Sequence, residues 1–123
     1  MKSELIARTK KFAIDCWKLC SKIPKSREFN AYVYQLLKSS SSVGANYRAS
    51  QRTKSTADFI NKLKIVEKET DESIFWLEMF YEILPEFKSE IEILKKEGNE
   101  LLAIFVASIN TAKRNNLKKP QKK

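Results

Sequence analysis

The stretch KSSSSVGANYRAS (residues 38–50) decides whether this chain forms one domain or two domains joined by a linker. Four consecutive serines and a glycine have the composition of a flexible linker. Residues nevertheless recur through the stretch at alternating steps of four and three, the spacing of one helix face: Phe29, Val33, Leu36, Ser40, Val43 and Tyr47. Because a linker has no reason to keep this spacing, the stretch predicts a continuous helix. Its serines and Gly44 predict a place where another backbone comes close, within the domain or across a subunit boundary.

Three further segments show helical periodicity, so the sequence predicts four helices, at about residues 3–23, 28–54, 56–84 and 88–115. Pro24 and Pro85 end the first and third helices, and Ser26 is a suitable N-cap for the second. Ser55 or Thr56 can cap the third helix, but residues 52–56 contain no Gly or Pro, so the chain is expected to bend there without a proper loop.

Short connections between these helices predict an all-α fold, an up-down-up-down antiparallel four-helix bundle over residues 1–116. The remaining residues, 117–123, are predicted to form a frayed basic tail. A length of 123 residues fits one domain, and two glycines and three prolines are too few for the turns of an all-β fold. Gly98 falls on the buried seam of the fourth helix. A neighbouring backbone, or a large ring such as Trp17 or Trp76, would offset its low helix propensity.

The two cysteines, Cys16 and Cys20, share one face of the first helix. The chain has no histidine and no second cysteine pair, so no metal site is expected, and no cofactor. Buried, reduced thiols are the predicted state, which is typical of a cytoplasmic protein. Charges interrupt the apolar residues near the N-terminus, and no apolar run approaches 18 residues, so neither a signal peptide nor a membrane partner is expected.

The net charge of +9 is unevenly distributed. Residues 1–27 carry eight basic and two acidic side chains, whereas residues 55–87 carry three basic and eight acidic ones. Residues 113–123 carry six basic side chains and none that is acidic. Such asymmetry predicts a polyanionic partner, RNA or DNA; a purely solubilising role and an anionic membrane surface are the alternatives.

The second and fourth helices run in the same direction, so their basic ends are predicted to merge into one patch with Tyr47 near its edge. Such a patch would bind phosphates with a strong dependence on salt and little sequence selectivity. The candidate nucleic-acid-binding residues are Arg48, Arg52, Lys54, Lys113, Arg114, Lys118 and Lys119.

The acidic run EKETDE (residues 67–72) places Glu69 and Glu72 on one helix face. Di-iron helical bundles combine such glutamates with histidine, which this chain lacks, so a solvated or ion-paired face is the expectation. An acidic surface that docks on the basic helices of another copy is the other interpretation. With no histidine base, no oxyanion loop and no phosphate-binding glycine motif, the chain is not expected to be an enzyme.

Residues 39–80, SSSSVGANYRASQRTKSTADFINKLKIVEKETDESIFWLEMF, resemble the four-helix-bundle proteins named for the intervening sequences of bacterial 23S rRNA genes. The likeness rests on the order and spacing of SVGAN-YR, S-x-x-DF-I-x-K-L and WLE, and the closing LLAIFVASINTAK (101–113) extends it. The resemblance implies a ring-shaped homopentamer. It also implies kinship with the accessory variability determinants of diversity-generating retroelements, which are basic pentamers that bind nucleic acid and a reverse transcriptase.

The resemblance also implies structural or interface roles, without catalysis, for Ser42, Asn46, Asp58, Lys62, Glu69 and Glu72. Gly44 in the serine run and Trp76 at the edge of the third helix's apolar stripe are further candidates for such roles. Arg48 belongs to the same family pattern. Proteins of this kind usually carry a glutamate where this chain has Ala49. If that glutamate serves a contact between helices or between subunits, this chain has lost or replaced the contact. The predicted function is therefore a non-enzymatic oligomeric bundle that binds nucleic acid. The alternative is a scaffold whose main partner is a protein, such as a reverse transcriptase or another polymerase.

Overall fold

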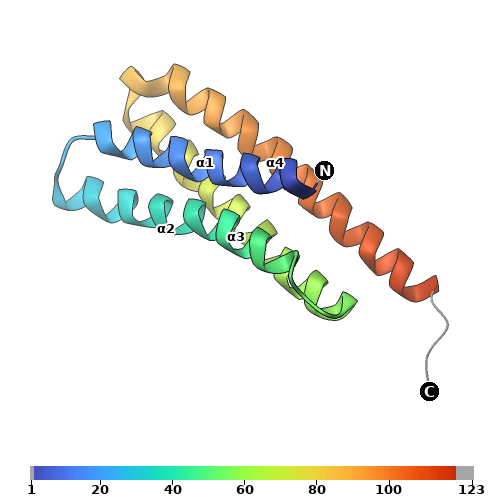
Figure 1. Cartoon of the computed structure of the whole chain (residues 1–123). Helices are drawn as coiled ribbons and strands as arrows, with labels where there is room; N and C mark the ends of the chain where they lie inside the picture. The colour runs from blue at the N-terminus through green and yellow to red at the C-terminus, as the bar shows by residue number, and fades with distance from the viewer. Residues whose placement is uncertain (1, 119–123) are drawn as a thin grey trace.

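The computed structural model describes residues 2–118 as four α-helices and one short 3-10 turn: α1 Lys2–Lys22, α2 Arg27–Ser50, α3 Thr56–Ile83, η1 Pro85–Phe87 and α4 Lys88–Lys118. Each helix packs antiparallel against the next one in the chain, and α4 returns beside α1 (Figure 1). Within the described residues, the backbones of α1 and α3 do not come close to each other, nor do those of α2 and α4, so these two pairs are diagonal. The predicted all-α up-down-up-down bundle is confirmed.

Helix α2 passes through the serine run without interruption, as the periodicity predicts. Ser39 and Ser40 are buried, and the hydroxyl of Ser39 donates to the carbonyl of Leu36 at 3.3 Å. The Oγ atom of Ser73 in α3 lies 2.9 Å from the Oγ atom of Ser39. These hydroxyls therefore find partners inside the bundle, and burial leaves none of them unsatisfied. The stretch is a packed helix and not a linker.

Gly44 marks the close approach of another backbone, and that backbone belongs to the same chain. A Cβ atom built on Gly44 would lie 3.5 Å from the carbonyl oxygen of Thr9 in α1. At Gly98 the neighbours are side chains, since a Cβ atom there would lie 3.0 Å from Ile74 Cγ1 and 3.6 Å from Phe12 Cε1. The tryptophan rings expected to cover Gly98 are not among its nearest neighbours.

Helix α2 ends at Ser50, four residues before the predicted end at residue 54. The Ser50 hydroxyl donates to the Tyr47 carbonyl at 2.6 Å, and the Thr53 hydroxyl donates to the Ser50 carbonyl at 2.8 Å. These side chains bond carbonyl groups that the helix end leaves unpaired. Ser55 then caps α3 by accepting the amide N–H three residues later at 3.1 Å. Residues 51–55 therefore form a short loop, where a bend without a loop was predicted.

At the other boundary, α4 continues to Lys118, past the predicted end at residue 115. Leu117 and Lys118, which were predicted to belong to a frayed basic tail, are therefore helical. Lys119 and the rest of that tail lie outside the described residues.

The core is continuous along the bundle axis. Its fully buried large side chains come from all four helices: Phe12, Leu19, Leu36, Val43, Leu63, Val66, Leu77, Phe80, Ile91, Leu101 and Phe105. Cys16 and Cys20 are free and buried among them. Burial raises the pKa of both thiols, to about 11 for Cys20 and further for Cys16. Protonated, buried thiols are inert, which agrees with the predicted packing role.

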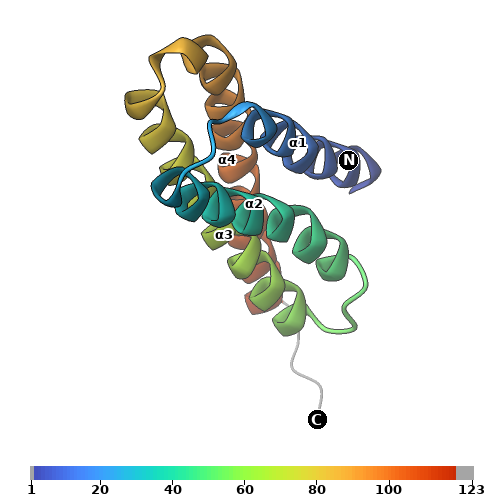
Figure 2. The ribbon, with the colours of Figure 1, turned by 90° about the vertical axis from the view of Figure 1, so that its left-hand side faces the viewer.

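Helix α1 is the helix least enclosed by its neighbours. It diverges from α4 toward its N-terminus (Figure 2). A two-pronged ion pair joins the two helices, because the Arg8 guanidinium donates to the Glu97 carboxylate at 2.6 and 3.0 Å. Lys22 donates to Glu90 at 2.9 Å near the other end of the same seam. Ion pairs therefore supplement a narrow apolar contact between α1 and α4.

Candidate nucleic-acid interface

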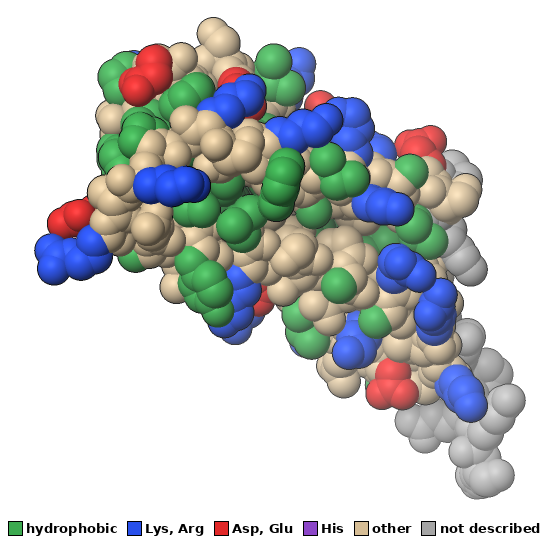
Figure 3. All heavy atoms as spheres, turned by 60° about the vertical axis from the view of Figure 1, so that its left-hand side comes forward, with side chains coloured by type: hydrophobic (Ala, Val, Ile, Leu, Met, Phe, Trp, Pro, Cys, Tyr) green, Lys and Arg blue, Asp and Glu red, His purple; other side chains and the backbone are tan. Residues whose placement is uncertain are grey.

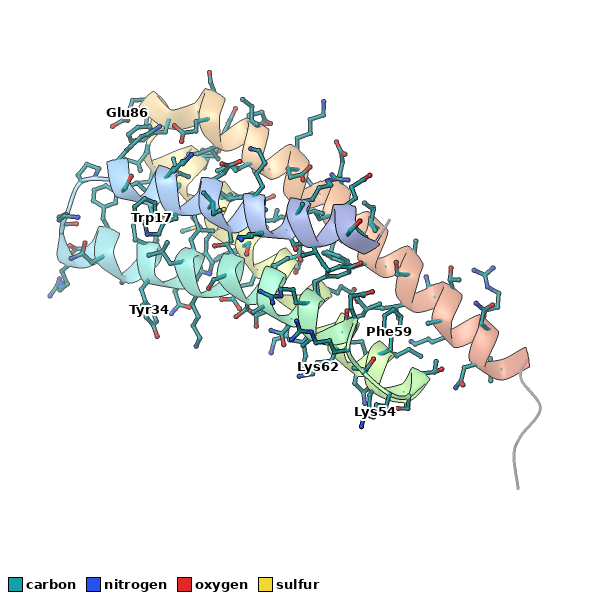
Figure 4. The ribbon with its side chains drawn as sticks, in the orientation of Figure 1. Trp17, Tyr34, Lys54, Phe59, Lys62 and Glu86 are labelled. Atoms are coloured by element: carbon teal, nitrogen blue, oxygen red, sulfur yellow. The ribbon has the colours of Figure 1, made fainter. Side chains whose placement is uncertain are left out.

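Five of the predicted binding residues lie at one end of the bundle. Arg48 occupies the last turn of α2, Arg52 and Lys54 lie in the following loop, and Lys113 and Arg114 lie near the end of α4. All five side chains are exposed. Figure 1 shows that the end of α2, the start of α3 and the end of α4 meet at this end, and Figure 4 labels Lys54 there. These five residues are called the basic end below.

Lys118 and Lys119 were also predicted to bind nucleic acid. Lys118 is the last residue of α4, so its backbone belongs to the same end of the bundle. Lys119 lies outside the described residues, and no position is assigned to it. A further basic residue, Lys64, was missed. It is exposed near the start of α3. The antiparallel order of the helices places the start of α3 beside the end of α2, and this order was the signal that would have identified Lys64.

The charge of the basic end is hardly compensated. The segments that build it, residues 43–66 and 103–118, carry eight basic side chains and one acidic side chain, that of Asp58. Figure 3 shows basic side chains gathered over this part of the surface with little acidic surface between them. Within residues 2–118, no ion pair involves any of the five residues of the basic end. Their positive potential therefore extends into solvent and is available to phosphate groups.

Tyr47 does not border this patch, contrary to the prediction. Its side chain is only 5% exposed, and the centroid of its ring lies 5.7 Å from the centroid of the Phe105 ring. Burial of the phenol raises the pKa of Tyr47. The periodicity that placed Tyr47 on the buried face of α2 was the correct signal. Without Tyr47, the basic end offers charges for phosphates rather than a ring for stacking on bases.

Most of the predicted interface residues line the surface between α2 and α3. The Ser39–Ser73 contact and the tilted contact between the Tyr32 and Trp76 rings, whose centroids lie 5.0 Å apart, define the sides on which these helices face each other. Helical spacing from these contacts places the following residues along the same seam: Ser42, Asn46, Asp58, Lys62, Glu69, Glu72 and Trp76. All of them except the exposed Asp58 are half-buried. Gly44 is separate from this set, because it faces α1.

Hydrogen bonds within each helix hold part of this seam. The side-chain amide of Asn46 donates to the Ser42 carbonyl at 3.0 Å, and the indole N–H of Trp76 donates to the Glu72 carboxylate at 3.3 Å. Within residues 2–118, no group of three or more acidic or cysteine side chains is placed to hold a metal ion. The arrangement positions side chains for packing and for surface contacts.

Lys62 is half-buried on this seam, and no described carboxylate forms an ion pair with it. The antiparallel register that brings residue 39 opposite residue 73 also brings Ala49 opposite residues 62 and 63. The glutamate that the family resemblance leads one to expect at position 49 would therefore lie beside Lys62.

Ala49→Glu is expected to stabilise the fold, because the new carboxylate lies across the α2–α3 seam from Lys62. Half-exposed ion pairs of this kind contribute up to about 1 kcal/mol. Urea denaturation in low salt measures the gain. Ala49→Gln is the uncharged control and should show less stabilisation. Equal stability of the two variants would show that a carboxylate at position 49 does not pair with Lys62.

No helix in the described part of the chain is both long and apolar enough to cross a membrane.

The sequence and the fold both match known proteins. Residues 1–107 match the family model described as 23S rRNA-intervening sequence protein. The structure is similar to the 1.70 Å crystal structure of a protein of unknown function from the S23 ribosomal protein family of Bacteroides thetaiotaomicron VPI-5482. The two share 28% sequence identity at a TM-score of 0.80, over 89% of this chain and 99% of that chain. None of the curated proteins compared matches the chain.

Proposed function

Because the chain belongs to the 23S rRNA-intervening sequence protein family, we propose that it is a non-enzymatic, oligomeric helical bundle that binds nucleic acid through the basic end. The observation that carries this proposal is the basic end itself, five exposed and unpaired basic side chains from α2, the following loop and α4. Phosphate binding releases counterions, so such a surface gains affinity without reading bases. RNA and single-stranded DNA of equal length are therefore expected to bind with similar strength.

The oligomer is proposed as a ring of five copies, on the strength of the family resemblance. The structure supports contacts between copies through its charge distribution. Residues 67–102, the second half of α3 and the first half of α4, carry eleven acidic and four basic side chains. This acidic region lies away from the basic end, so one copy offers complementary surfaces to another. The reduced thiols Cys16 and Cys20 fit a cytoplasmic location.

The alternative function is a scaffold whose main partner is a protein such as a reverse transcriptase or another polymerase. The acidic region favours it, because that surface repels nucleic acid while remaining available to a protein. The protein can be purified from its host at low salt and the molecules that accompany it identified. This experiment distinguishes nucleic-acid binding from the scaffold function. Nucleic acid that is released by added salt supports the proposed function. A polymerase that remains bound after nuclease treatment supports the scaffold.

A further inference from the structure

An exposed tryptophan projects from one face of the bundle. The indole of Trp17 on α1 is 60% exposed, and Ile14, one turn earlier, is also exposed. Figure 4 shows Trp17 on the face formed by α1 and α2. Lys10 and Lys18 flank it along the helix, and both are exposed. Within residues 2–118, neither lysine makes an ion pair or a side-chain hydrogen bond, so this apolar knob carries two free positive charges.

A groove of opposite charge lies between α3 and α4. Its lining residues are Glu67, Lys68, Asp71, Leu102 and Val106. Leu102 and Val106 make an apolar floor, and Val106 is among the exposed large hydrophobic residues. Glu67 and Asp71 outnumber the one basic group, Lys68, and the acidic region continues beyond them along α3 and α4. The groove therefore combines an apolar surface with negative charge.

The knob and the groove lie on opposite faces of the molecule, because α1 packs beside α2 whereas α3 packs beside α4. One copy cannot fill its own groove. We propose that Trp17 of one copy docks in the α3–α4 groove of a second copy, where Lys10 and Lys18 approach Glu67 and Asp71. Burial of an indole stabilises such a contact, and the paired charges set its orientation.

This contact joins two different surfaces, so an open chain of copies retains one free knob at one end and one free groove at the other until it closes. Such head-to-tail contacts produce a ring when the rotation between copies closes, and a filament when it does not. The inference rests on the proposed self-assembly and specifies the surfaces that make it. It leaves the basic end uncovered for nucleic acid.

Trp17→Ala is expected to weaken self-association about thirtyfold, as the loss of a central interface tryptophan does. Light scattering and sedimentation over a dilution series measure the change, and circular dichroism confirms that the variant is folded. Ile93→Ala is the matched control. Ile93 is 72% exposed on the side of α4 that faces α1, away from the groove, so its removal should leave association unchanged.

Charge reversal provides a second test that does not alter the apolar surface. The double variant Lys10→Glu, Lys18→Glu reverses the charge of the knob. The double variant Glu67→Lys, Asp71→Lys reverses the charge of the groove. Each double variant alone is expected to be monomeric at concentrations where the wild type associates. An equimolar mixture of the two should associate again, because each reversed knob meets a reversed groove and each native knob meets a native groove. Two variants cannot alternate around a ring of five copies, so the mixture is expected to form open or even-numbered assemblies.

The results of these experiments distinguish failure of the knob-and-groove contact from failure of the proposed self-assembly. A wild type that is monomeric at micromolar concentration overturns both. A wild type that associates, together with Trp17→Ala and charge-reversed variants that associate equally well, overturns only the knob-and-groove contact. Loss of association in either double variant without recovery in the mixture also contradicts the pairing of these charges.

Discussion

The triple variant Arg48→Gln, Arg52→Gln, Lys54→Gln neutralises the residues of the basic end that come from α2 and the following loop. It is expected to bind nucleic acid more weakly, on the order of ten- to hundredfold, at low salt. The three side chains are exposed and unpaired, and little local carboxylate compensates their charge. Each is expected to make at least one phosphate contact. Fluorescence anisotropy with a labelled single-stranded RNA, titrated with protein, measures the affinity.

The matched control removes three exposed lysines elsewhere, in the variant Lys25→Gln, Lys38→Gln, Lys96→Gln. It changes the net charge by the same amount, so any difference reports position. If both triple variants lose affinity equally, net charge rather than the basic end attracts the nucleic acid. If neither loses affinity, the basic end is not the binding surface.

Gly44→Leu is expected to lower the free energy of unfolding by about 1–3 kcal/mol, the usual cost of inserting carbon atoms into a packed site. The side chain would enter the space where the backbone of Thr9 lies, 3.5 Å from the position of the first added carbon. A neighbouring helix backbone gives way less easily than the end of a flexible side chain. Urea denaturation at one fixed protein concentration measures the loss, since association of copies also affects stability.

Gly44→Ala is the control for this substitution. Its Cβ atom makes ordinary van der Waals contact with α1 at 3.5 Å, and alanine favours the helix over glycine by about 1 kcal/mol. The alanine variant is therefore expected to be as stable as the wild type or more stable. A leucine variant that matches the alanine variant would show that α1 does not pack closely at Gly44.

The fold could be predicted because the helical spacing survives the serine run. Ser40 is a polar residue, yet its position on the periodic face of α2 predicts burial, and it is buried. The end of α2 could not be predicted from the same spacing. Residues 51–55 contain neither glycine nor proline, and the helix ends where the hydroxyls of Ser50 and Thr53 bond backbone carbonyls. Such local hydrogen bonds depend on tertiary context that periodicity does not contain.

The candidate site was predictable in part. The antiparallel order of the helices places Arg48 and Lys113 at one end, which sequence reasoning captured. The neighbour of Gly98 was not predictable, because Ile74 approaches it only through the register between α3 and α4. The knob at Trp17 and the groove at Val106 depend on which helix pairs are adjacent. Spacing along one helix identifies a face but not the surface that another helix leaves uncovered.

The most direct test of nucleic-acid binding through the basic end is the slope of log affinity against log salt concentration for single-stranded RNA. Each phosphate contact contributes about 0.7 to this slope. Binding through the basic end predicts a steep slope for the wild type. For the Arg48, Arg52 and Lys54 triple variant it predicts a slope shallower by about 2, the sum for three lost contacts. Equal slopes for the two proteins, or no detectable binding by the wild type at low salt, would contradict it.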